Sequence, residues 1–438
     1  MICDANDRMI TFRATPRPQA SGARRSRPIV AFMSADVARR LPFRRPSLGL
    51  LLTGVLALAG TPAAVAGTIP LISPTPGRTV GFDGSVYAST HVGGTVYLGG
   101  NFTHAIVDGK PVPRKRLAAV DARTGVLLPW APAAGGTVLA LTASGSSLYV
   151  TGRFTTISGR ARAGLAGLDL VTGAVGPLQH TVGGTGQAMA AAGGRLYLGG
   201  SFTAVDGRPA RNLAAFRMSD GTLDSGFLGN ADGKVQVLNA AGSRLYVGGV
   251  FKRVDDTAGT ARLAALRLTD GQVDTGFRPV TPYPAMAVTV TAERVYAGLA
   301  GAGGRVAAYR TDGSLAWSSV TDGDVQAIAY LDGAVYAGGH FTVACPESSR
   351  TATSWCPTTQ RSRPRLAAWD PATGALLDWN PRGNGVWGVL TIDADPALSA
   401  IAVGGDFTAF GSANRPRFTQ FRACDAGCGG YGRPSRNR

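Results

Sequence analysis

Short apolar segments alternate with turn residues along most of this chain, between residues 84 and 422. One segment consists of an aliphatic residue, tyrosine, an aliphatic residue, small residues and phenylalanine, as in Val96–Phe102. It returns about every 50 residues, a period typical of repeat architectures. The central positions of its copies are Tyr97, Tyr149, Tyr197, Tyr246, Tyr296, Tyr336 and, in the last copy, Ala402.

Two further apolar segments accompany each tyrosine segment. One precedes it, as in Val138–Leu141, and one follows it and leads into a tight turn, as Leu117–Asp121 leads to Thr124-Gly125. Asp-Gly and Thr-Gly supply the positive φ that hairpins require. No segment keeps the 3.6-residue apolar period of a helix over ten residues. Each unit is therefore predicted to contain three clear strands and a weak fourth.

This pattern predicts an all-β fold, a seven-bladed β-propeller of four-stranded antiparallel blades. The blades are expected to start near residues 84, 136, 186, 234, 286, 324 and 385. The last unit lacks a clear fourth strand, and residues 70–80 belong to no unit. We expect this N-terminal segment to supply the outer strand of the last blade and so close the ring.

The first 66 residues are predicted to be a leader with a signal peptide, and residues 67–438 the propeller. Arginines, among them Arg39 and Arg40, precede the apolar run Leu48–Ala59, and Ala64-Val65-Ala66 follows, which is the order of a secretory signal. The run is too short to span a bilayer. We expect a secreted or surface-associated protein without a transmembrane anchor. The start codon (Met1 or Met33) and the export route (general or twin-arginine) stay open.

Four cysteines remain after cleavage, namely Cys345, Cys356, Cys424 and Cys428. Thiols of exported proteins tend to pair. Cys345 and Cys356 flank an insertion in the sixth unit, whereas the other two follow a third strand and are expected toward the opposite face. Local bridges, Cys345–Cys356 and Cys424–Cys428, are therefore favoured. No CxxC or Cys/His cluster suggests a metal site.

The repeats resemble the delta-60 repeat propellers, exported bacterial proteins of mostly unassigned function. The resemblance rests on aliphatic-Tyr-aliphatic-Gly-Gly-x-Phe-Thr, Arg-x-Leu-Ala-Ala and Asp-x-x-Thr-Gly, and covers nearly all of residues 84–422. It implies the propeller fold and says little about function.

Two segments, 119–130 and 368–379, are also similar to the tryptophan-docking motif of quinoprotein dehydrogenase propellers. They end in Trp130 and Trp379. In that family the motif locks blades together and is not catalytic. The adjacent cysteines that accompany the quinone there are missing, and the repeat is seven-fold and not eight-fold. We therefore expect no quinone and no other cofactor.

Residues for catalysis do not form a legible motif. The four histidines, at positions 91, 104, 180 and 340, lie in different units. There is no GxSxG, HExxH or P-loop, and Asp322-Gly323-Asp324 is better explained as a hairpin turn than as a calcium loop. The sequence favours a non-catalytic protein, but leaves open an active site assembled from distant loops.

Basic residues are the one functional signal. The chain carries 44 Lys and Arg against 27 Asp and Glu, and many of the basic residues fall in the loops between second and third strands, which share one face of a propeller. The candidate ligand-binding residues are Lys110, Arg114, Lys115, Arg160, Lys252, Arg253, Trp355, Arg361 and Arg363. A one-sided positive field attracts polyanions.

A structural role is the alternative for part of this charge. One arginine stands just before the third strand of most units, at positions 116, 162, 211, 262, 365 and 417. Repetition at one register suggests a contact with a neighbouring carboxylate or carbonyl.

The sequence thus predicts a monomeric, exported, non-catalytic propeller that binds an anionic cell-wall polymer, a polysaccharide or a surface protein through its basic loops. The alternative is an extracellular hydrolase or lyase that acts on acidic polysaccharide. A purely structural docking module is a third interpretation. Nucleic acid is not expected as the natural target, because no basic groove studded with aromatic residues is legible.

Overall fold

The computed structural model describes residues 69–351, 355–356 and 358–423. They belong to one compact unit and contain strands and turns but no helix. Among these residues there is therefore no helix that could cross a membrane. The predicted leader, Cys424 and Cys428 lie outside the described residues.

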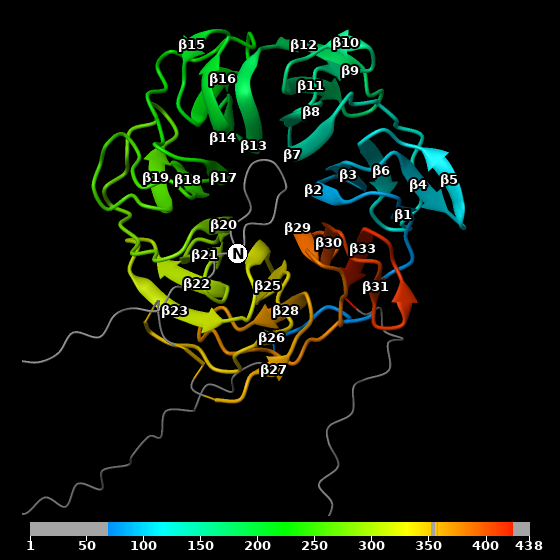
Figure 1. Ribbon diagram of the computed structural model, residues 1–438, viewed down its shortest axis with the longest axis vertical. Coiled ribbons are helices and arrows are strands. Elements are labelled where there is room, and N and C mark those ends of the chain that lie inside the picture. The colour runs from blue at the N-terminus through cyan, green and yellow to red at the C-terminus, as the bar shows by residue number, and fades with distance from the viewer. Residues whose placement is uncertain (1–68, 352–354, 357, 424–438) are drawn as a thin grey trace, which may run out of the picture. The chain divides into compact units, whose positions relative to one another are not determined.

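The larger sheets are antiparallel, and each follows the chain from its first strand outward. In Figure 1 they surround a common centre, with β2, β7, β13, β17 and β29 innermost. In chain order they are β2 (Val86–Val92), β3 (Thr95–Gly100) and β6 (Leu117–Asp121); β7 (Thr137–Ser144), β8 (Ser147–Arg153), β11 (Leu165–Asp169) and β12 (Val175–Gln179); β13 (Val182–Ala192), β14 (Arg195–Val205) and β16 (Leu213–Arg217); β17 (Val235–Ala241), β18 (Arg244–Gly249) and β19 (Leu263–Arg267); β20 (Ala285–Val290), β21 (Arg294–Leu299), β22 (Arg305–Arg310) and β23 (Leu315–Val320); β24 (Val325–Leu331), β25 (Ala334–Gly339) and β28 (Leu366–Trp369); and β29 (Val389–Asp395), β30 (Ala400–Gly405) and β33 (Phe418–Arg422).

The predicted fourth strand is fully formed in only two of these sheets, as β12 and β23. In four others it shrinks to one isolated bridge; the bridges are Val120↔Leu127, Phe216↔Leu223, Leu266↔Val273 and Trp369↔Leu376. A buried aromatic side chain follows each of these bridges. Trp130, for example, turns inward and lies edge-on against Tyr97, with ring centroids 5.1 Å apart. Trp317 contacts Tyr296 from within the fully formed β23, so such a ring alone does not end the outer strand. The expectation of four-stranded units was wrong for most of them.

Neighbouring sheets meet closely because a glycine of one sheet faces a valine of the next. A Cβ atom on Gly99 would lie 2.6 Å from Cγ1 of Val138, and one on Gly338 would lie 2.5 Å from Cγ1 of Val389. The same relationship joins the last sheet to the first, because a Cβ on Gly404 would lie 2.6 Å from Cγ1 of Val86. The first glycine of these Gly-Gly pairs thus serves the packing between sheets, whereas the second, such as Gly100 beside the carbonyl of Ser85, lies against the backbone of its own unit.

The chain between second and third strands folds back as a short hairpin in most units. We call these the outer hairpins, because Figure 1 shows them at the perimeter of the sheets. They are β4 (His104–Val107) with β5 (Lys110–Pro113), β9 (Thr156–Ile157) with β10 (Arg160–Ala161), the end of β14 with β15 (Arg208–Pro209), the turn around Val254, β26 (Val343–Ala344) with β27 (Arg361–Ser362), and β31 (Ala409–Phe410) with β32 (Ala413–Asn414).

Aspartates in the segments that enter the sheets fasten several outer hairpins. Asp83 accepts hydrogen bonds from the backbone N–H groups of Thr103 (2.8 Å) and His104 (3.0 Å). Asp232 accepts the equivalent pair from Lys252 and Arg253. Partial burial raises the pKa of Asp83, but hydrogen bonds from Thr103 and His104 outweigh it and lower the pKa to about 2.

The N-terminal segment lies along β33, the third strand of the last sheet. Ser73 donates its N–H to the carbonyl of Arg422 (2.7 Å), and Gly77 donates to that of Gln420 (2.8 Å). Residues 70–80 form no regular strand of their own. The short strand β1 (Gly81–Phe82) follows and pairs with β4 in the first unit.

Candidate functional site on the outer hairpins

Arginines at one position of the outer hairpins are bound by backbone carbonyls. Arg114 donates to the carbonyls of Pro113 (2.8 Å) and Leu128 (2.7 Å). Arg162, Arg363 and Arg415 repeat this arrangement; each binds the carbonyl of the preceding residue and that of a residue at the outer edge of its sheet, respectively Gly176, Leu377 and Gly77. These side chains tie each outer hairpin to its own sheet.

A second position, two residues later, has left-handed backbone geometry. Arg116, Arg262, Arg365 and Arg417 all have φ between 67° and 70°. They donate to carbonyls as well, for example Arg116 to Ala134 (2.9 Å) and Arg365 to Phe341 (3.1 Å). The predicted structural contact of the repeated arginines is therefore confirmed for these four. In the second and third units the residue with positive φ at this position is Gly164 and Asn212, respectively. Arg162 and Arg211 therefore stand at a different position of the repeat.

Two predicted ligand-binding residues therefore serve the fold. Arg114 and Arg363 are held by carbonyls as described, and Arg363 is only 6% exposed. Burial lowers the pKa of both guanidinium groups. Guanidinium groups that already donate to the backbone are less accessible to a ligand than the exposed basic side chains.

The other basic candidates are exposed on separate outer hairpins. They are Lys110, Lys115, Arg160, Lys252, Arg253 and Arg361, and the same description fits Arg208 and Arg211. None of them forms an ion pair within the described part of the chain; the guanidinium of Arg253 contacts only the carbonyl of Asp256 (3.4 Å). The outer hairpins lie around the perimeter (Figure 1), so these charges are distributed and do not converge on one cleft.

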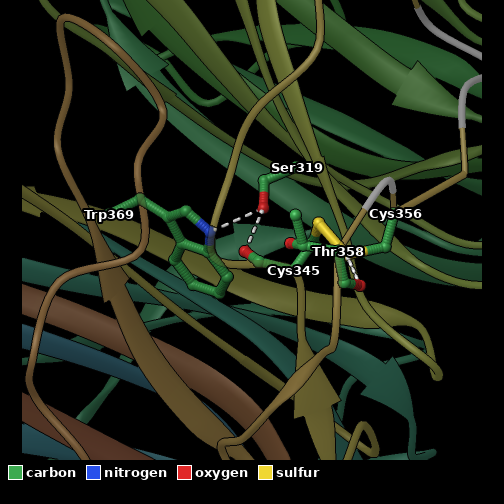
Figure 2. Close-up of a disulfide and its surroundings, with 5 residues drawn as sticks. All are labelled: Ser319, Cys345, Cys356, Thr358 and Trp369. Carbon is green, nitrogen blue, oxygen red and sulfur yellow. Dashed lines mark hydrogen bonds between the residues drawn. A yellow bond between two sulfur atoms is a disulfide. The ribbon is translucent and has the colours of Figure 1, made fainter.

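The insertion of the sixth unit is closed by a disulfide between Cys345 and Cys356. Its first part extends the sheet of the preceding unit, because Cys345 donates its N–H to Val320 of β23 (2.8 Å) and Ser349 to Ser318 (2.7 Å). Figure 2 shows the buried end of this insertion. There the indole N–H of Trp369 donates to the hydroxyl of Ser319 (3.0 Å), which in turn donates to the carbonyl of Cys345 (3.2 Å).

Trp355, at the other end of the insertion, is 71% exposed. The first part of the insertion, around Cys345 and Ser349, thus covers the outer edge of β23, and the side chain of Trp355 faces solvent. Trp355 directly precedes the disulfide-bonded Cys356, so its exposed side chain stays a candidate contact residue.

Three of the four histidines have an aspartate partner that sequence reasoning missed. Nδ1 of His91 lies 2.6 Å from Asp393, and the same distance separates His180 from Asp206; His104 lies 3.1 Å from Asp83. No group of three metal-ligating side chains occurs among the described residues. The pair His91–Asp393 joins β2 to β29, and no sequence signal marks it because the two residues are 302 positions apart.

A cavity of about 600 Å³ lies between the second and third sheets. Tyr149, Leu178 and Phe216 form part of its apolar wall, and Gln179 and Arg217 are among its polar lining residues. Sequence reasoning missed this feature too. The available signal was Leu178 itself, which stands where the first and sixth units have Trp130 and Trp379.

Comparison with known proteins supports the fold. A protein-family model for the "Domain of unknown function (DUF5122) beta-propeller" matches residues 194–227, which span β14 and β16. The WD40 β-propeller domain of Doa1 is 12% identical, with a TM-score of 0.50 over 79% of this chain and 95% of that chain. The computationally designed protein Ika8 is 13% identical, with a TM-score of 0.46 over 80% of this chain and 100% of that chain. No curated protein matches significantly.

The family-model match, the similarity to the Doa1 domain and the sheet topology agree on one conclusion. The chain has a β-propeller fold. Identities near one in eight carry the fold alone, and so the activity must be argued from the residues of this chain.

Proposed function

We propose that the larger sheets are the seven blades of a closed propeller of the delta-60 repeat type. Arg415 supports closure most directly. In other units the arginine at this position binds a carbonyl in its own outer segment, 14 residues later in the chain. In the last unit the acceptor is Gly77, 338 residues earlier. The N-terminal segment therefore takes the position of the missing outer strand, and Gly404 packing on Val86 supports the same seam.

We further propose that the mature protein is exported and binds an anionic polymer through the exposed basic residues of its outer hairpins. The observation that carries this proposal is the contrast between two classes of basic residue. Half-buried arginines are occupied by backbone carbonyls, whereas Lys110, Lys252 and Arg361 project from rigid hairpins without an ionic partner in the described structure. Side chains of this second class are accessible to phosphate, sulfate or carboxylate groups.

The arrangement of these charges favours a long ligand. Exposed basic side chains on successive outer hairpins can bind repeated anionic groups of one polymer. Because these groups are covalently linked, weak individual contacts together give a higher overall affinity. Each exposed contact contributes little alone and is screened by salt. The disulfide of the insertion is consistent with an oxidising compartment, in which wall polymers and acidic polysaccharides are available ligands.

The test is binding of the purified protein to a polyphosphate-containing wall polymer and to a uronic-acid polysaccharide across a salt series. The test variant carries Lys110→Ser, Lys252→Ser and Arg361→Ser. The control variant carries Arg123→Ser, Arg278→Ser and Arg310→Ser, which removes the same charge from exposed turns away from the outer hairpins. We expect salt-sensitive binding that falls at least tenfold in the test variant and less than threefold in the control. Equal loss of binding in both variants would show that binding depends only on net charge, and would refute a role for the outer hairpins.

A further inference from the structure

An aromatic side chain fills the space beside the repeated tyrosine in most units. Trp130 lies against Tyr97 at an interplanar angle of 78°, and Trp379 against Tyr336 at 80° with centroids 4.9 Å apart. The remaining pairs are Phe227 on Tyr197, Phe277 on Tyr246 and Trp317 on Tyr296. Edge-to-face contacts of this kind stabilise aromatic pairs beyond the effect of burial alone.

The indole N–H groups of Trp130 and Trp317 also donate to a carbonyl of the next sheet, whereas that of Trp379 has no hydrogen-bond partner among the described residues. The indole N–H of Trp130 donates to the carbonyl of Asp169, the last residue of β11 (3.1 Å). The hydroxyl of Tyr97 donates to the carbonyl of the following residue, Leu170 (2.6 Å). In the first unit the ring of Trp130 is thus fixed by packing on the ring of Tyr97 and by a hydrogen bond to the carbonyl of Asp169.

The second unit departs from this rule. The segment Asp169–Leu178 has the same Asp-x-x-Thr-Gly-x-x-x-Pro order as the segment that ends at Trp130, but it ends in leucine. Leu178 does not turn away from its sheet, and β12 continues to pair through Gln179. Among the described residues, Tyr149 has neither an aromatic neighbour in ring contact nor a hydrogen-bond partner for its hydroxyl.

The cavity of about 600 Å³ lies at this position. It is lined by Tyr149 and Leu178, and by Arg217 and Met218, which correspond in the third sheet to Asp169 and Leu170 in the second. The carbonyl of Arg217 accepts one hydrogen bond, from Gly221 (2.9 Å), as that of Asp169 does from Gly173. Its second lone pair is therefore available in the way that the Asp169 carbonyl is available to Trp130.

We infer that this crevice binds a small molecule that carries a flat aromatic ring with an N–H donor. The ligand ring packs edge-on against Tyr149, in the position that a tryptophan or phenylalanine of the chain occupies in most other units. The N–H group of the ligand donates to the carbonyl of Arg217. The volume exceeds that of one indole and lies in the range of small-molecule sites. The polar remainder of the ligand contacts the side chains of Gln179, Arg217 and Asp220, which line the cavity.

Titration of the full protein with indole tests this inference, with toluene as the matched ring that has no N–H. We expect saturable binding of one indole, at least fivefold tighter than toluene. Leu178→Trp places the ring of the chain itself in the crevice and should abolish binding while the melting temperature is kept or raised. If the tryptophan side chain is too large for the crevice, Leu178→Phe serves the same purpose.

A gain-of-site variant provides the control. Trp130→Leu opens the equivalent space beside Tyr97 between the first and second sheets, and should raise the stoichiometry from one indole to two. The inference is overturned if the wild-type protein binds no indole up to the solubility limit, or if the two Leu178 variants bind it as the wild type does. Equal affinity for toluene and indole would refute the carbonyl contact.

Discussion

Arg415 donates a hydrogen bond of 2.7 Å to the carbonyl of Gly77, which joins the last outer hairpin to the first described part of the chain. Its other bond, to the carbonyl of Asn414, also measures 2.7 Å. The side chain therefore adds to the backbone hydrogen bonds by which Ser73 and Gly77 join the N-terminal segment to β33.

Removal of this link should destabilise the whole unit. We expect Arg415→Ala to lower the free energy of unfolding by about 1–2 kcal/mol, the usual range for a lost bond from a charged donor. Arg160→Ala is the control, because Arg160 is exposed on its hairpin, and should cost less than about 0.5 kcal/mol. Urea unfolding at equal protein concentration measures both, and equal values would contradict a role of Arg415 in joining the ends.

The contact between Gly404 and Val86 should tolerate no added methyl group. A Cβ on Gly404 would also lie 2.8 Å from Cγ2 of Thr391, so both neighbours would have to move. We expect Gly404→Ala to cost about 1–3 kcal/mol through overpacking. Gly94 has nothing within 4 Å of its Cβ position and gives the matched control, Gly94→Ala, with a change near zero. Thermal unfolding followed by circular dichroism separates the two, and a neutral Gly404→Ala would disprove the close approach.

Asp83 should make stability depend on acid pH. Its folded-state pKa is about 2, below the ordinary value of 3.8. The stabilisation is therefore complete above pH 4 and is lost as the pH falls from about 4 through 2. We expect the melting temperature of the wild type to fall more steeply in this window than that of Asp83→Asn, which should already be less stable at pH 7. Asp108→Asn, in an exposed hairpin turn, should retain the wild-type slope.

The disulfide should protect the insertion more than the whole propeller. Backbone bonds to β23 hold the chain near Cys345 in the absence of the disulfide. We expect the double variant Cys345→Ser, Cys356→Ser to be cleaved by trypsin after Arg350 or Arg361 at least tenfold faster, with a loss of at most about 3 kcal/mol in global stability. Mass spectrometry of the first fragments identifies the sites. Unchanged cleavage at both arginines would show that the disulfide does not restrain this loop.

The sequence predicted the strands of each unit because their signals are local. Apolar segments, Thr-Gly turns and Gly-Gly pairs all lie within about 50 residues of one another. The outer strand was mispredicted because its pairing depends on packing between sheets that the local sequence does not show. The ring of Trp130, for example, packs on Tyr97 and donates to a carbonyl of the next sheet.

The basic residues show a similar limit. In the sequence Arg114 and Lys115 are equivalent neighbours, yet the first binds two carbonyls and the second is exposed. The difference arises because the outer segment of the same sheet places the carbonyl of Leu128 beside only one of them. Contacts between distant segments, such as His91 with Asp393, were beyond local reasoning for the same reason.

The contact of Gly77 with β33 also has a consequence for biosynthesis. The ribosome makes Gly77 before any of the strands that follow it, whereas its partner Gln420 is made 343 residues later. Throughout translation the early segment therefore lacks its partner, and any fragment that stops short of β33 keeps an uncovered sheet edge of the kind that promotes aggregation. The contacts of the N-terminal segment can therefore form only after β33 has been made, so a stop codon anywhere before β33 leaves them unformed.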